Sequence, residues 1–140
     1  MIEVDILGAQ PAARRIAPSQ VRELCMRAAE SRGVASGHVA VHFVTAERIA
    51  ELNAEHRGRA APTDVLSFPI DEVEPLPEEA MRELGDVVIC PEHTGDLREA
   101  ILHGMLHLLG MDHEADDGEM LALQSELLAL AGATSAAPRE

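Results

Sequence analysis

Residues 103–113, His-Gly-Met-Leu-His-Leu-Leu-Gly-Met-Asp-His, constrain the fold more than any other part of this chain. The residues around the first two histidines are long and helix-favouring, and none of them is β-branched, so they predict a helix. On that helix His103 and His107 project from one face with Cβ atoms about 5–6 Å apart. Gly110 predicts the end of the helix, because glycine adopts the left-handed conformation of helix termini at low cost.

His113 lies beyond this break. On a continued helix it would point away from the other two, about 240° round the axis from His107, but a chain that turns back at Gly110 can bring it to the same place. Three imidazoles leave one position of a tetrahedral Zn²⁺ open, which is typical of a catalytic zinc site. We therefore expect His103, His107 and His113 to hold one zinc ion per chain, with Ni²⁺ and other imidazole-favouring divalent metals as alternatives.

The same spacing occurs in the zinc-protease pattern H-E-x-x-H-x-x-G-x-x-H, in which the glutamate is the general base. Gly104 stands at that position in this chain. A metallopeptidase is therefore the less favoured interpretation. The competing structural interpretation is that one histidine is packed in the core and two are solvated. It does not explain why a helix-ending glycine, Gly110, stands where the chain has to turn to bring His113 back.

The composition limits how the chain can meet nucleic acid. The formal net charge is −14, which argues against broad, nonspecific binding of phosphate backbones. All 11 basic residues are arginine, which can hold a phosphate bidentately, so any RNA contact has to be local. With no Trp or Tyr and only two Phe, an aromatic platform for stacked bases is not expected.

The 140 residues predict a single domain over residues 1–132, with a frayed tail at 133–140. Residues 1–10 lack the basic region of a signal peptide, and no uncharged apolar run reaches membrane-spanning length. Cys25 and Cys90 form no C-x-x-C pair and fit a reducing compartment. We expect a soluble, cytoplasmic protein that does not bind membranes.

Hydrophobic periodicity and turn residues predict four strands and four helices in the order β-α-β-α-β-β-α-α. The strands are expected at 2–7, 38–45, 63–70 and 85–90, and the helices at 18–32, 46–56, 97–109 and from a capping pair, Asp116 and Glu119, to about 130. The acidic stretch 71–83 is expected to be a loop. The predicted class is α+β, a single layer of mixed four-stranded sheet packed with about four helices.

His38 and His42 fall on the strand face opposite Val39, Val41 and Phe43, so we interpret them as surface or structural residues. Ser67 has no base or orienting acid that the sequence identifies. We therefore expect it to pack or to bond to backbone instead of acting as a nucleophile.

Four ordered blocks between about residues 40 and 113 resemble the YbeY family of bacterial endoribonucleases. They are Leu52-Asn53-x-x-x-Arg57, residues 62–68 (Pro-Thr-Asp-Val-Leu-Ser-Phe), Gly85-Asp86-Val87-x-Ile89 and the histidine segment 103–113. The resemblance implies a zinc-dependent, single-strand-specific endoribonuclease that acts in small-subunit rRNA 3′-end maturation and in ribosome quality control. It also implies rRNA, the small ribosomal subunit or assembly factors as partners. A nonenzymatic ribosome-assembly factor, whose metal only fixes the turn at His113, is the alternative.

The resemblance places the metal ligands on His103, His107 and His113 and an important arginine on Arg57. A guanidinium near a metal can clamp a phosphodiester and stabilise developing charge. The structural alternative is an arginine that ends a helix and interacts with its dipole, worth about 0.3–1 kcal/mol. Arg59 is a further candidate for phosphate contact, or a solvated loop charge.

Asp64, Asp86 and Asp112 are candidates to orient a ligand imidazole through its second ring nitrogen, or else they cap and turn the chain. The chain also departs from the family. His56 stands where tyrosine is common, and Ala60 or Ala61 replaces an acid. The segment between residues 90 and 103 is shorter than expected, so the substrate groove is expected to differ.

Overall fold

The computed structural model describes residues 2–8, 15–58, 63–69, 83–112 and 115–135, and of Arg57, Pro69 and residues 132–135 only the backbone. The strands are β1 (Ile2–Leu7), β2 (Gly37–Phe43), β3 (Val65–Pro69) and β4 (Glu83–Ile89). The helices are α1 (Pro18–Ser31), α2 (Ala46–Arg57), α3 (Leu97–Leu108) and α4 (Glu119–Ser135), with a short 3₁₀ turn, η2 (Pro91–His93), before α3. The predicted α+β class and the predicted order of elements are confirmed.

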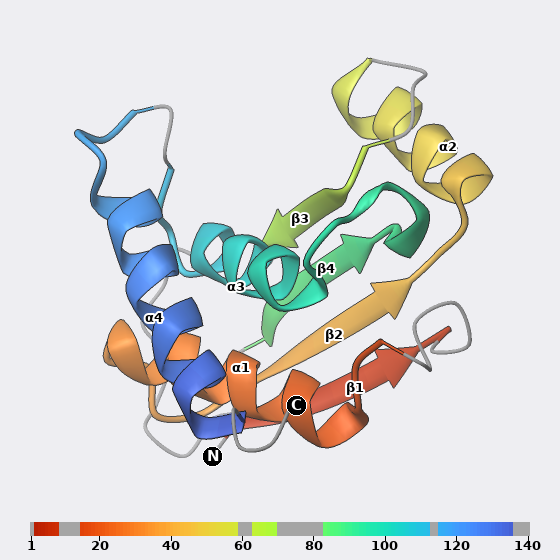
Figure 1. Cartoon of the computed structure of the whole chain (residues 1–140). Coiled ribbons are helices and arrows are strands. Elements are labelled where there is room, and N and C mark those ends of the chain that lie inside the picture. The colour runs from red at the N-terminus through yellow and green to blue at the C-terminus, as the bar shows by residue number, and fades with distance from the viewer. Residues whose placement is uncertain (1, 9–14, 59–62, 70–82, 113–114, 136–140) are drawn as a thin grey trace.

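The strands form one mixed sheet in the order β1-β2-β4-β3 (Figure 1). β1 pairs parallel with β2, and β2 pairs parallel with β4. β3 pairs antiparallel with β4 and forms an edge of the sheet. This arrangement sets β3 beside α3, the helix that carries the first two predicted ligands.

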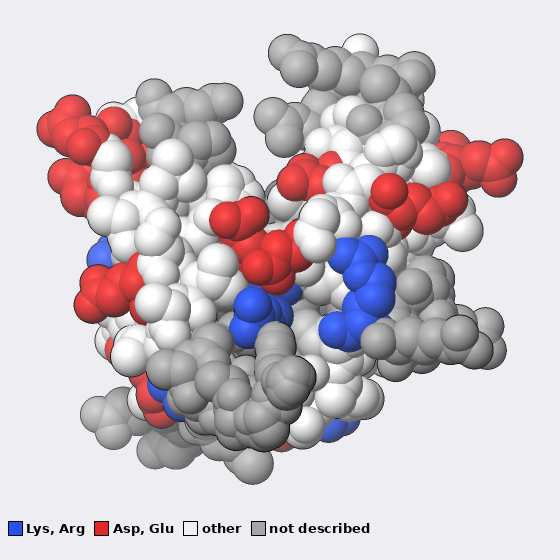
Figure 2. Space-filling model, in the orientation of Figure 1, with Lys and Arg blue, Asp and Glu red and all other residues white. Residues whose placement is uncertain are grey.

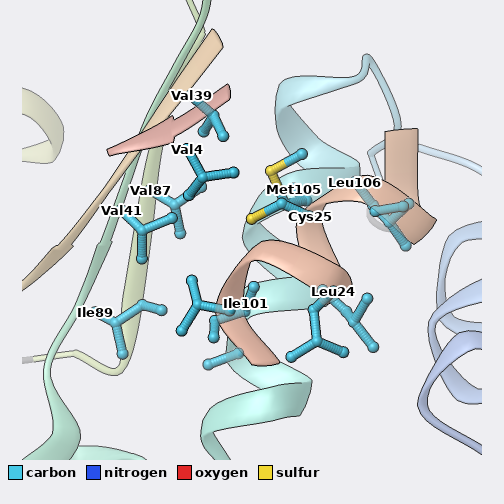
Figure 3. Packing of buried hydrophobic residues seen from close by; sticks show 14 of the residues in the cluster. Val4, Leu24, Cys25, Val39, Val41, Val87, Ile89, Ile101, Met105 and Leu106 are labelled. Carbon is cyan, nitrogen blue, oxygen red and sulfur yellow. The ribbon is translucent and has the colours of Figure 1, made fainter. Parts of the chain in front are cut away.

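The main core lies between one face of the sheet and helices α1 and α3. Strand alternation points Val39, Val41 and Val87 to this face, where they meet Cys25 of α1 and Met105 of α3 (Figure 3). All five of these side chains are buried. The close-packed sheet therefore gives α3 a rigid base.

The opposite face is covered at one end by α2. Ile49 of α2 forms a second buried cluster with Leu66, Val88 and Cys90. His38 lies on this opposite face, as predicted, and its two ring nitrogens contact Asp5 and Glu83 of the flanking strands at 2.8 and 2.9 Å. Both are structural contacts between strands.

Several predicted boundaries were wrong. Glu83 belongs to β4 and not to a loop, because it is in register with His38 of β2. α4 continues past residue 130 to Ser135, because Leu127 and Ala131 pack into the core and extend the buried stripe. The predicted loop at 71–82 and the last five residues of the predicted tail lie outside the described residues.

The predicted cap of α2 is present, and at the start of α4 Asp116 and Glu119 both accept from backbone amides without forming a reciprocal pair. Thr45 Oγ1 accepts a hydrogen bond from the Arg48 amide at 3.2 Å at the start of α2. The Asp116 carboxylate accepts from the amides of Gly118 and Met120, at 2.8 and 3.0 Å, at the start of α4. No helix in the described part of the chain is both long and apolar enough to cross a membrane.

Candidate metal centre

Polar contacts fix the chain just before α3. The Asp96 carboxylate accepts hydrogen bonds from the amides of Arg98 and Glu99, at 3.0 and 3.4 Å, and so caps the helix. The Arg15 guanidinium donates to the carbonyls of Pro91, Thr94 and Gly95 at 2.7–3.1 Å. These contacts fix where α3 begins, and with it the positions of the histidines that follow.

At Gly104, α3 packs closely against the sheet. A Cβ atom at this position would lie 2.5 Å from Val87 Cγ1, 3.2 Å from Ser67 Oγ and 3.3 Å from Val65 Cγ2. Ser67 Oγ donates to the Gly104 carbonyl at 3.0 Å, as expected for a residue that bonds to backbone. A glutamate, the protease base, has no room here.

His103 and His107 lie side by side on α3. Their ring centroids are 4.8 Å apart, the rings are nearly perpendicular at 77°, and both side chains are half-buried. The prediction that they share one face is therefore confirmed.

Hydrogen bonds to the first ring nitrogen orient both imidazoles. His103 Nδ1 lies 2.8 Å from Gln124 Oε1, and His107 Nδ1 lies 3.0 Å from the Met111 carbonyl oxygen. A carbonyl oxygen can only accept, so each Nδ1 carries the proton and the lone pair of the neutral ring is on Nε2. Metal-binding histidines commonly have this arrangement, so the two residues fit a metal ion.

The chain turns back after α3 as Gly110 predicted. Gly110 has a φ of 97°, and the Met111 amide donates to the Leu106 carbonyl at 3.0 Å. The same turn supplies the carbonyl that holds His107. His113, the predicted third ligand, lies outside the described residues, and within those residues no group of three His, Cys, Asp or Glu side chains is arranged to hold a metal.

Of the three candidate aspartates, two have partners elsewhere. Asp64 Oδ1 accepts from the Val65 amide at 2.8 Å, and Asp86 Oδ1 contacts His42 Nε2 at 2.9 Å on the α2 side of the sheet. Asp112 is exposed, and its carbonyl accepts from the amides of residues 115 and 116 in the turn before α4. The contacts of Asp64 and Asp86 described above are those of a turn residue and a strand residue.

Sequence reasoning missed both orienting groups. The signal for Gln124 was present, because it is a polar residue in an otherwise apolar stripe that also contains Met120, Leu127 and Ala131. The Met111 contact uses a backbone atom, which no residue type reveals.

A notch separates two raised parts of the surface in Figure 2, one over α2 and one over the segment that leads into α4. Acidic side chains stand on both parts. Arg57 is the last residue of α2, and Gly58 follows it with a φ of 72°. The Arg57 side chain and all of Arg59 lie outside what the structure describes.

Comparison with known proteins decides the family. The chain matches the family Endoribonuclease YbeY over residues 10–132. It belongs to this family. The match confirms the resemblance to YbeY proteins that the sequence blocks indicated. YbeY proteins are metal-dependent endoribonucleases, hydrolases that cleave phosphodiester bonds in RNA.

Individual YbeY proteins agree with this assignment. The Endoribonuclease YbeY of Bacillus cytotoxicus is 39% identical over 134 residues, which cover 81% of this chain and 86% of the relative. That of Rubrobacter xylanophilus is 38% identical and covers 89% and 93%. The solution structure of TM1509 from Thermotoga maritima is similar, with a TM-score of 0.58 and 27% identity over 94% of this chain and 90% of that one.

Proposed function

We propose that this YbeY protein is a zinc-dependent, single-strand-specific endoribonuclease that acts in small-subunit rRNA 3′-end maturation and ribosome quality control. In this proposal His103, His107 and His113 hold the metal, and Arg57 contacts the scissile phosphate. Ribosomal assembly factors or the small subunit itself are the proposed partners. Ni²⁺ is the alternative metal, because imidazole suits it as well.

The orientation of the two imidazoles on α3 is the observation that carries this proposal. Both first ring nitrogens are committed to oxygen acceptors, so both second nitrogens present a lone pair. Two such nitrogens one helical turn apart suit one divalent cation. The turn at Gly110 supports His113 as the third ligand, because it reverses the chain three residues before it.

The chemistry divides between the metal and the protein. Bound Zn²⁺ supplies a Lewis acid that polarises a phosphoryl oxygen and favours attack by water near neutral pH. Arg57 can hold two phosphate oxygens through its planar guanidinium and stabilise the charge that develops on them during cleavage. The half-buried imidazoles and the Ser67–Gly104 contact keep the ligand helix rigid.

The acidic surface on both sides of the notch supports a local mode of RNA binding. Carboxylates repel phosphates, so binding has to rely on the metal and a few arginines. Single strands suit such a site, because they can bend a few phosphates into the notch without bringing a second strand close to the acidic surface.

The test combines metal analysis with cleavage of a single-stranded RNA. We expect wild-type protein to contain about one zinc per chain, and His107→Ala to lose both metal and cleavage. Arg57→Ala is expected to keep the metal but to cleave about 10²–10³-fold more slowly. Arg48→Ala is the matched control, because Arg48 is an exposed arginine on the same helix that pairs with Glu51 at 3.0 Å.

Each alternative predicts a different result. A nonenzymatic assembly factor predicts that Arg57→Ala and His107→Ala stay folded and that any RNA cleavage by the preparation is unchanged. Cleavage of duplex and single-stranded RNA at the same rate contradicts the single-strand specificity. Equal loss in Arg48→Ala and Arg57→Ala contradicts the role given to Arg57.

A further inference from the structure

Gln124 is a polar side chain in the buried stripe of α4. The stripe contains Met120, Gln124, Leu127 and Ala131, at helical spacings of four, three and four residues. Only 8% of Gln124 is exposed. Burial of an amide at such a position is costly unless it forms hydrogen bonds, so its partner indicates its role.

Gln124 contacts a proposed metal ligand. Its Oε1 lies 2.8 Å from His103 Nδ1, across the interface between α4 and α3. The amide oxygen can only accept, so it favours the tautomer of His103 that has the proton on Nδ1 and the lone pair on Nε2. A hydrophobic residue at position 124 removes this preference.

The choice of an amide has a chemical consequence. A carboxylate at this position would also accept from Nδ1, but its charge would favour the protonated imidazolium, which cannot bind a metal. The amide oxygen that faces His103 Nδ1 favours the metal-binding tautomer without adding a charge that stabilises the imidazolium. We propose that Gln124 is a positioning residue that holds His103 in its metal-binding tautomer, and thereby links the docking of α4 to metal affinity.

This inference rests on the proposed metal site, but its first readout does not need the metal. Long-range ¹H–¹⁵N spectra of the metal-free protein at about pH 8, where an ordinary histidine is neutral, show which ring nitrogen carries the proton. Loss of one signal set in His103→Gln assigns His103. We expect the wild-type protein to have the proton on Nδ1, and Gln124→Leu to have it mainly on Nε2 or divided between both nitrogens.

The second readout is zinc affinity, measured by competition with a coloured chelator. We expect Gln124→Leu to bind zinc about 10–100-fold more weakly than wild type. Gln124→Glu keeps an acceptor, so it is expected to restore the Nδ1 proton at about pH 8, and its zinc affinity is expected to lie between those of Gln124→Leu and wild type because its charge also favours the imidazolium. If Gln124 acts only in folding, zinc affinity in the two variants is not expected to change together with the position of the His103 proton.

Gln20→Leu is the matched control. Gln20 Oε1 accepts from the Ala17 amide at 2.9 Å at the start of α1, so the variant loses a glutamine hydrogen bond of similar length elsewhere. It is expected to leave the His103 tautomer and zinc affinity unchanged.

The inference is overturned if wild-type His103 carries its proton on Nε2, a result that needs no variant to fold. It is also overturned if Gln124→Leu keeps both the wild-type tautomer and an affinity within twofold of wild type. Failure of the proposed metal site is a separate result, because wild-type protein that takes up no zinc contradicts that site whatever the tautomer of His103.

Discussion

Gly104 and Val87 bring α3 and β4 together beside the candidate metal centre, with room for a hydrogen atom but not for a methyl group between them. A Cβ at Gly104 would lie 2.5 Å from Val87 Cγ1, and Val87 is itself fully buried. The residue after the first histidine is thus fixed by helix–sheet packing. In zinc proteases the residue at this position is the glutamate that acts as catalytic base. The contact with Val87 leaves no space for a glutamate side chain at position 104 of this protein.

Gly104→Ala is therefore expected to destabilise the protein. Alanine is the better helix former by about 1 kcal/mol, but overpacking against a stiff β-branched side chain costs about 1–3 kcal/mol. The approach of 2.5 Å to Val87 Cγ1 puts the cost in the upper part of that range, so we expect a net loss of about 1–2 kcal/mol in the free energy of unfolding, measured with urea.

Gly95→Ala is the matched control, because no atom lies within 4 Å of a Cβ built there. It is expected to change the free energy of unfolding by less than about 0.5 kcal/mol. A Gly104→Ala protein as stable as wild type shows that α3 can move away from the sheet, and contradicts a rigid contact.

Ser67→Ala tests the contact beside this glycine. Ser67 Oγ donates to the Gly104 carbonyl at 3.0 Å, so its loss is expected to cost about 0.5–1.5 kcal/mol of unfolding free energy. RNA cleavage is expected to persist, because the hydroxyl is engaged with backbone. Complete loss of cleavage in a folded Ser67→Ala protein means that the hydroxyl takes part in the reaction.

The sequence predicted most of the fold because its signals are local. Alternation marked the inward face of β2, Thr45 marked the start of α2, and Gly110 marked the turn after α3. The ends of elements fixed by tertiary contacts were missed, such as Glu83, whose strand pairing depends on His38 of β2.

For the candidate site, the sequence predicted that two side chains meet on α3 but not what orients them. Helical spacing placed His103 and His107 together, because i and i+4 positions share a face whatever surrounds them. Their orienting partners depend on how α4 and the turn at Met111 dock onto α3, which local pattern does not encode. For Asp86 the sequence was misleading. Its sequence block made it a candidate to orient a metal ligand, but strand alternation places its carboxylate on the other face of the sheet, where it contacts His42.

Protonation of His38 is expected to make part of the stability depend on pH. Hydrogen bonds from His38 to Glu83 and Asp5 raise its pKa above the ordinary 6.5. The folded state thus favours the imidazolium. Its stabilising contribution is complete below the unfolded-state pKa and is lost as pH rises through the higher folded-state pKa.

The measurement compares wild type with His38→Gln by urea unfolding between about pH 5.5 and pH 9, above the ordinary range of the carboxylates. The stability advantage of wild type is expected to shrink as pH rises. In an Asp5→Asn, Glu83→Gln background, which lacks both charged acceptors, the substitution of His38 is expected to have the same effect at every pH. An advantage of wild type that grows with pH contradicts the assigned role.

Removal of the metal is expected to lower stability through His103 and His107. A ligand that binds only the folded protein adds about 2.7 kcal/mol at a free concentration of 100 times its Kd. We expect zinc at that concentration to raise the free energy of unfolding of wild type by about this amount, and excess chelator to abolish the gain. Urea unfolding with zinc and with chelator gives the difference.

His107→Ala is expected to lose the zinc-dependent gain, since the variant lacks one of two nitrogens that lie one helical turn apart. His38→Gln, which removes a histidine from the other face of the sheet, is expected to keep it. Equal zinc stabilisation in wild type and His107→Ala places the stabilising ion elsewhere on the protein. Because the chelator arm uses the same proteins, a loss of stability in His107→Ala from packing alone appears with and without zinc and cancels from the comparison.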